Sequence, residues 1–253
     1  MMESDKFVFF IDIDNTLLTH GEVCESNIKA IEEARKRGHL VFINTARSYA
    51  IIPQSVRDIP FDGYVTSLGN LIMMGNDTIY NVTIPHEETA EIFDYFTGSK
   101  RSIHLEGEEY FFRNRFSDTE FGVLLESGKE LMEKYSSCRI SKVYIPYVLP
   151  EEECKYLSSK YMFYKHGTYC EYGVAGNTKA TGIIRVMDYL KISVKNSVAI
   201  GDSVNDIEMM EASGISIAMG DGNDVVKEMC DIVTCDSDLG GVGEGILRVI
   251  NGK

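Results

Sequence analysis

Short clusters of carboxylate and hydroxyl residues follow three apolar runs of strand length in this 253-residue chain. Asp12 and Asp14 come directly after the first run. Thr45 follows the second run and Asp202 the third. Ligands of open parallel sheets bind beyond the carboxyl ends of the strands, so we expect these side chains to meet at one edge of a sheet. Several carboxylates in one place repel one another unless a cation joins them, and hard oxygen ligands suit Mg²⁺, which keeps positions open for a substrate phosphate.

Four residues in or near these clusters have both a functional and a structural interpretation. Asp206 begins a predicted helix, where a carboxylate also favours the helix dipole. Thr45 can donate its hydroxyl to a phosphate oxygen or cap the following helix, and both can hold at once. Lys179 opens another predicted helix, which is an unfavourable place for a cation. Arg47 either binds a substrate anion or lies in solvent, and the residues alone leave these alternatives open.

The first 80 and the last 80 residues alternate between apolar strands and amphipathic helices. This rhythm predicts a doubly wound parallel (Rossmann-like) sheet, and the fold class α/β. Ser26 is expected to cap the first helix. Strands are expected at residues 7–13, 40–43, 64–67, 197–200, 215–218 and 232–234.

The middle of the chain has a different pattern. Residues 139–145 alternate between polar and apolar side chains, which indicates a half-buried strand of an antiparallel sheet. Helices are expected near residues 87–96, 119–135 and 151–160 on one face of that sheet. We therefore expect an α+β cap domain at residues 83–170, inserted into a core formed by residues 1–82 and 171–253.

Composition excludes several classes of partner. The chain has 25 basic and 39 acidic residues, a formal net charge of −14, which repels nucleic acids and anionic membranes. The six cysteines include no pair with the CxxC spacing of a zinc or redox site. No apolar stretch has the length of a membrane span or the form of a signal peptide. We expect a cytoplasmic protein that binds neither nucleic acid nor membrane.

Four segments, in order, resemble the motifs of the haloacid dehalogenase (HAD) superfamily. Residues 12–18, Asp-Ile-Asp-Asn-Thr-Leu-Leu, look like its DxDGTLL motif, with Asn15 in place of the usual Gly. Residues 44–47 resemble its second motif, Lys179 its third, and residues 201–206 its fourth. The order, the spacing and the large insertion between the second and third motifs are similar to the Cof-type subfamily. Because Asn tolerates a positive φ, its replacement of Gly is compatible with the same loop.

The resemblance implies a magnesium-dependent phosphatase acting on small phosphorylated metabolites, with sugar phosphates as the expected class. In this superfamily the first Asp is the nucleophile, which implies that Asp12 forms an aspartyl-phosphate. Asp14 would protonate the leaving alcohol and then activate water. The residues implied to hold Mg²⁺ are Asp12, Asp14 through its backbone carbonyl, and Asp202, with Asp206 in support. Those implied to hold phosphate or substrate are Thr45, Lys179, Asn205 and Arg47.

Two other functions are compatible with parts of this pattern. A phosphomutase has the same reacting side chains, and the sequence hardly distinguishes a phosphomutase from a phosphatase. A receiver-like signalling module is also doubly wound and phosphorylated on Asp, but the long insertion and the acid at position 14 argue against it. The resemblance implies that the cap domain sets the substrate specificity of such enzymes. The sequence therefore does not identify the substrate.

Overall fold

The computed structural model describes residues 6–252, which form two compact units. The first unit consists of three segments: the chain up to Ala46, Ile52–Tyr80, and the chain from Thr178 onward. The second consists of Arg47–Ile51 and Asn81–Asn177. Within the described part of the chain, no helix is both long enough and apolar enough to cross a bilayer.

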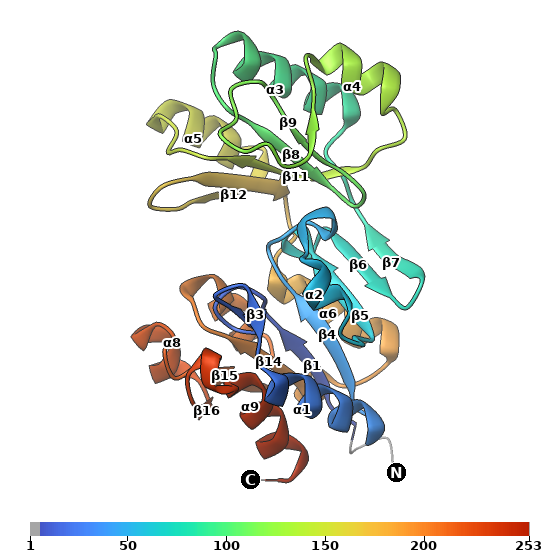
Figure 1. Cartoon of the computed structure of the whole chain (residues 1–253), viewed down its shortest axis with the longest axis vertical. Coiled ribbons are helices and arrows are strands. Elements are labelled where there is room, and N and C mark those ends of the chain that lie inside the picture. The colour runs from blue at the N-terminus through green and yellow to red at the C-terminus, as the bar shows by residue number, and fades with distance from the viewer. Residues whose placement is uncertain (1–5, 253) are drawn as a thin grey trace. The chain divides into compact units, whose positions relative to one another are not determined.

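The first unit is built on an eight-stranded sheet (Figure 1). In six of these strands every neighbouring pair is parallel, and the last two strands form an antiparallel edge. Apart from the edge strand at residues 232–233, the parallel strands are apolar and almost wholly buried, as expected for a sheet covered on both faces. The predicted parallel sheet is confirmed. Its strands, in spatial order, are β16 (Ile232–Val233), β15 (Ile215–Ala218), β14 (Ser197–Gly201), β1 (Val8–Ile11), β4 (Leu40–Asn44), β5 (Gly63–Thr66), β6 (Leu71–Met74) and β7 (Asp77–Asn81).

The chain builds this sheet outward from β1 in two directions. It first adds β4 and β5 on one side of β1, and much later adds β14, β15 and β16 on the other. β1 and β14 are therefore direct neighbours, with Ile11 opposite Ile200. Their carboxyl ends form the point at which the strand order reverses, which is where ligands of doubly wound sheets bind.

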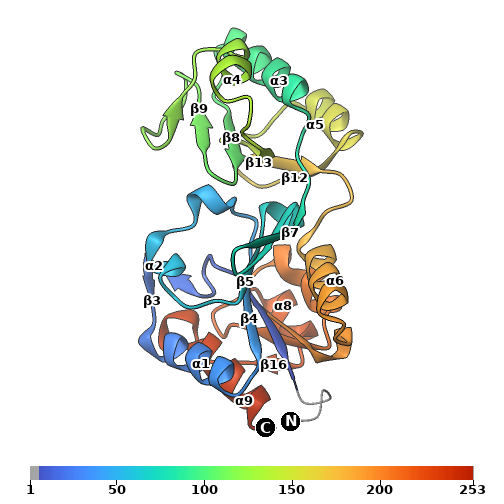
Figure 2. The same ribbon diagram turned by 90° about the vertical axis from the view of Figure 1, so that its right-hand side faces the viewer.

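Helices cover both faces of the sheet (Figure 2). α1 (Glu25–Lys36) and α9 (Gly241–Ile250) pack together on one face. α6 (Lys179–Leu190), α7 (Ile207–Glu211) and α8 (Asp224–Met229) contribute apolar side chains to a core on the other face. The smaller elements of this unit are β2 (Leu18–Thr19), β3 (Glu22–Val23), α2 (Gln54–Arg57) and the short 3₁₀ turns at Ser67–Gly69, Val194–Asn196, Val204–Asp206 and Ser237–Leu239. The 3₁₀ turn Tyr49–Ile51 belongs to the second unit.

The second unit contains a six-stranded sheet with three helices on one face (Figure 2). All neighbouring strands are antiparallel except β9 and β10. The predicted cut after residue 170 falls inside β13, which pairs within this unit. The strands, in spatial order, are β10 (Val123–Leu124), β9 (Phe111–Arg113), β8 (His104–Gly107), β11 (Ile140–Ile145), β13 (Cys170–Val174) and β12 (Tyr161–Lys165), and the helices are α3 (His86–Gly98), α4 (Gly128–Lys134) and α5 (Glu151–Ser158).

Two helix starts differ from the prediction. Ser26 lies inside the first turn of α1, whose N-cap is Cys24. The helix expected over residues 119–135 is reduced to α4, since Ser127 accepts a hydrogen bond from the backbone N–H of Glu130 and so caps a later start. The residues before it form a loop and β10 instead.

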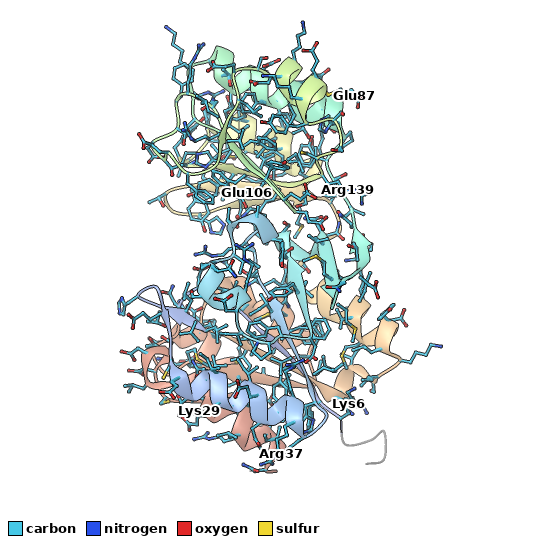
Figure 3. The ribbon with its side chains drawn as sticks, turned by 45° about the vertical axis from the view of Figure 1, so that its right-hand side comes forward. Lys6, Lys29, Arg37, Glu87, Glu106 and Arg139 are labelled. Carbon is cyan, nitrogen blue, oxygen red and sulfur yellow. The ribbon has the colours of Figure 1, made fainter. Side chains whose placement is uncertain are left out.

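β11 contradicts the half-buried strand predicted for residues 139–145, because five of its six residues are buried. The Nζ of Lys142 lies 2.9 Å from Oε2 of Glu171 and 3.3 Å from Oε2 of Glu106, which Figure 3 labels. Burial alone would raise the pKa of Glu171, but the Lys142 ammonium and a hydrogen bond with His166 outweigh it and hold the pKa at about 2. The polar positions of this strand therefore mark a buried ion cluster rather than a solvated face.

Lys142→Met is expected to destabilise the protein by about 3–5 kcal/mol, because it leaves two buried carboxylates without their cation. Urea unfolding measures this change. Lys155→Met is the matched control, since Lys155 is exposed on α5 and pairs with the exposed Glu151. It is expected to change stability by no more than about 0.5 kcal/mol. Equal stability of the two variants would contradict the prediction.

Candidate active site

The acidic segments that follow β1 and β14 meet at the point where the strand order reverses. The backbone N–H of Asp12 donates to the carbonyl of Ile200 at 3.0 Å, which continues the pairing of the two strands by one residue. Carboxylate oxygens of Asp12, Asp202 and Asp206 lie within 4.8 Å of one another. The structure thus brings together three of the predicted site residues from segments about 190 positions apart in the chain.

The ammonium of Lys179 joins two of these carboxylates. Its Nζ lies 2.8 Å from Oδ1 of Asp12 and 2.7 Å from Oδ1 of Asp206. Lys179 is the first residue of α6, and Thr178 and Thr181 close a capping box around that helix start. Burial by itself lowers the pKa of Lys179, but the two carboxylates outweigh it and hold the pKa well above its usual value. The ion pairs explain why a cation occupies an unfavourable end of a helix.

Asp206 is the fixed centre of the loop that follows β14. Its Oδ2 accepts hydrogen bonds from the backbone N–H groups of Asp202 and Ser203, both at 3.1 Å, and from the Ser203 hydroxyl at 3.3 Å. A side chain at Gly201 would collide with the Asp206 carboxylate, so the glycine permits this close packing. Because Lys179 holds the other oxygen, both oxygens of Asp206 are engaged within the protein.

Asp202 has a different environment, in which one oxygen is held by a neutral group. Thr16 is fully buried, and its hydroxyl donates to Oδ1 of Asp202 at 2.9 Å. Burial raises the pKa of Asp202 to about 6, although the Thr16 hydrogen bond favours the ionised form. Burial also raises the pKa of Asp12, against the effect of the Lys179 ammonium. Both carboxylates are therefore in places where an additional positive charge would stabilise their ionised forms.

Asp14 and Asn15 lie in the loop between Asp12 and β2. Asn15 has a φ of 54°, so the residue that replaces glycine here adopts the left-handed conformation expected of it. The Asp14 side chain is exposed and does not belong to the group of three converging carboxylates. Its predicted metal contact through the backbone carbonyl stays a prediction.

The remaining predicted residues occupy other surroundings. Thr45 is buried directly after β4, at the same end of the sheet as Asp12. Asn205 is exposed on the turn Val204–Asp206. Arg47 belongs to the second unit, where its guanidinium donates to the carbonyl of Ile51. The contacts of Thr45, Asn205 and Arg47 with a phosphate or substrate stay predictions.

Three polar residues of this site received no role from the sequence. Ser203 has the S-x-x-D spacing to Asp206 that is typical of a capping box, so the sequence carried this signal. Thr16 contacts a residue 186 positions away. Asn44 is buried and donates from Nδ2 to the backbone carbonyl of Lys179 at 3.1 Å. The last two contacts join distant segments, and no local pattern reveals them.

Comparison with known proteins shows the family to which the chain belongs. A family model of haloacid dehalogenase-like hydrolases matches residues 9–246. The chain is 25% identical over 246 residues to the 5-amino-6-(5-phospho-D-ribitylamino)uracil phosphatase YcsE of Bacillus subtilis, covering 93% of this chain and 92% of the relative. It is 22% identical over 275 residues to the pyridoxal phosphate phosphatase YbhA of Escherichia coli, covering 94% and 97%.

Solved structures of similar fold match nearly the whole length of the chain. One of them, a HAD subclass IIB sugar phosphatase, superposes with a TM-score of 0.77 at 25% sequence identity and covers 96% of this chain and 98% of its own. A HAD-superfamily phosphatase from Bacteroides thetaiotaomicron has a TM-score of 0.80 over 96% and 95% of the two chains, at 24% identity. The chain belongs to the haloacid dehalogenase-like hydrolases and is a phosphatase of the Cof type.

Proposed function

We propose that the protein is a cytoplasmic, magnesium-dependent phosphatase that hydrolyses small phosphorylated metabolites, sugar phosphates first among them, through an aspartyl-phosphate. The observation that carries the proposal is the cluster of three carboxylates around the Lys179 ammonium. This cluster has a net negative charge, so a phosphate dianion needs a further cation in order to approach it. The similarity to a subclass IIB sugar phosphatase supports the substrate class.

The donor set of the cluster fits Mg²⁺. Lys179 engages Oδ1 of Asp12 and Thr16 engages Oδ1 of Asp202, so we assign the second oxygen of each residue to the metal. Both carboxylate oxygens of Asp206 accept hydrogen bonds within the protein, so Asp206 supports the metal site by holding Lys179 and the backbone of Asp202 in place. Mg²⁺ is usually bound through one or two carboxylates, with water and substrate phosphate filling the other positions. When bound, the cation neutralises charge on the phosphoryl oxygens.

The residues of the chain then carry two displacements at phosphorus. An oxygen of Asp12 attacks phosphorus and the bond to the ester oxygen breaks, while Asp14 donates a proton to that leaving oxygen. Asp14 next takes a proton from water, which attacks the aspartyl-phosphate, releases inorganic phosphate and restores the Asp12 carboxylate. Lys179 lies against Oδ1 of Asp12, where its remaining N–H can bind a phosphate oxygen. We assign the other phosphoryl and substrate contacts to Thr45, Asn205 and Arg47.

Turnover is expected to require a divalent cation, because the ionised carboxylates otherwise repel the substrate. The measurement is release of inorganic phosphate from a panel of phosphorylated metabolites, with excess chelator and with Mg²⁺ restored. The panel includes sugar phosphates, pyridoxal phosphate and 5-amino-6-(5-phospho-D-ribitylamino)uracil. We expect activity to disappear in chelator and to return with Mg²⁺.

Two outcomes would contradict the proposal. Full turnover in excess chelator would show that hydrolysis does not require a metal bound to the cluster. The second outcome is measured with a bisphosphate activator present. Conversion of the phosphorylated substrate into an isomer, in place of release of free phosphate, would identify a phosphomutase.

A further inference from the structure

We propose that Thr16 makes the metal site selective for Mg²⁺ over Ca²⁺ by restricting Asp202 to ligation through a single oxygen. The inference rests on the proposed function, since it concerns the metal of that site. It assigns a specificity role to Thr16, which acts through its hydrogen bond with Asp202.

The geometry places Thr16 as a fixed clamp on one side of the Asp202 carboxylate. Thr16 is fully buried, and its hydroxyl donates to Oδ1 of Asp202 at 2.9 Å. The backbone of Asp202 is held on both sides: its N–H donates to Asp206 at 3.1 Å, and its carbonyl accepts from the N–H of Asn223 at 2.7 Å. With the backbone fixed, the Thr16 bond determines how the carboxylate plane is turned.

Mg²⁺ and Ca²⁺ differ in what they require of such a carboxylate. Ca²⁺ takes six to eight oxygens at about 2.3–2.6 Å and often binds both oxygens of one carboxylate. Mg²⁺ requires six ligands in nearly ideal octahedral geometry at about 2.0–2.1 Å. A hydroxyl that donates to Oδ1 occupies a lone pair and draws charge from that oxygen, so it disfavours bidentate binding.

Other donors engage oxygens of the other two carboxylates of the cluster. Lys179 holds one oxygen of Asp12, and Asp206 has both oxygens engaged. Lys179 makes the contact with Asp12 and one of the contacts with Asp206, and it cannot be replaced by a neutral residue without changing the charge of the site. The clamp on Asp202 is a neutral hydroxyl, so removing it changes the ligating mode while the charge stays constant. Thr16 is therefore the residue at which metal preference can be tested alone.

The test is isothermal titration calorimetry of Mg²⁺ and Ca²⁺ into the full-length protein, without substrate. Thr16→Val removes the hydroxyl and keeps the shape of the side chain. We expect Mg²⁺ binding to weaken by about 10- to 100-fold, the usual effect of losing a group that orients a metal ligand. Ca²⁺ binding should stay equal or become tighter, so that the preference for Mg²⁺ falls by about tenfold or more.

Three further variants serve as controls. Thr16→Ser keeps the hydroxyl and should restore the wild-type preference, whereas Thr16→Ala should reproduce the effect of Thr16→Val if valine prevents folding. Thr66→Val is the matched control, because Thr66 is a fully buried threonine whose hydroxyl has no hydrogen-bond partner among the described residues. Its metal preference should equal that of the wild type. Thermal unfolding in chelator reports whether each variant is folded.

The outcomes separate this inference from the proposed function. Equal weakening of both cations, or no change in either, would overturn the inference and leave the metal site itself intact. If the wild-type protein binds neither cation, the proposed metal site is wrong and the inference falls with it. A preference lost in Thr16→Val and Thr16→Ala and kept in Thr16→Ser supports the inference.

Discussion

Asp12→Asn is expected to lower turnover on every substrate by on the order of 10⁶-fold, the scale of removing a catalytic nucleophile. The amide has nearly the shape of the carboxylate but does not form the covalent intermediate. Lys179 keeps its ion pair with Asp206 in this variant, at 2.7 Å in the wild type. Phosphate release, with alkyl and nitrophenyl phosphates as substrates, measures the effect.

The same variant is expected to be at least as stable as the wild-type protein. Burial raises the pKa of Asp12, which means that its ionised form costs folding free energy at neutral pH. A neutral amide removes that cost, so the midpoint of thermal unfolding should not fall. Asp77→Asn, at an exposed position of β7, is the control for the substitution itself and should leave turnover unchanged. Residual turnover of Asp12→Asn within tenfold of wild type would exclude Asp12 as the nucleophile.

The predicted residues that the structure brings together share a local signature in the sequence. Asp12 and Asp202 directly follow apolar runs that become buried parallel strands, and the alternation of strands and helices requires those strands to end on the same edge. Lys179 was visible for a different reason, since a cation at the start of a helix breaks a local rule. Such conflicts between local preference and position are expected where a site needs them, and the two ion pairs of Lys179 supply the compensation.

The features that the sequence did not reveal depend on contacts between distant segments. A period of two in residues 139–145 shows which side chains share a face of the strand. It does not show whether that face is exposed to solvent or buried. Lys142 can be buried because it forms ion pairs with Glu106 and Glu171, which lie on the two neighbouring strands. The bond from Thr16 to Asp202 likewise exists only because β1 and β14 pair.

Asp14→Asn is expected to slow hydrolysis in a way that depends on the leaving group. An alkyl phosphate leaves as a poor alkoxide that needs a proton, so its first step should slow by about 10²–10⁴-fold, the scale of general acid catalysis. A nitrophenyl phosphate leaves as a stable anion, and its first step should largely survive. The second step lacks its base with either substrate, so the aspartyl-phosphate should accumulate.

Rapid mixing with nitrophenyl phosphate should therefore give a burst of nitrophenolate, followed by slow turnover. Mass spectrometry after quenching should find one added phosphate on Asp12. The Asp14 side chain is exposed and lies outside the three-carboxylate cluster, so the substitution should not disturb the pairs made by Lys179. Asp12→Asn is the matched control, because it should show neither burst nor adduct. Equal slowing of both substrates, without a burst and without an adduct, would mean that Asp14 is not the general acid and base. Both proton transfers would then have to be assigned to another group near Asp12.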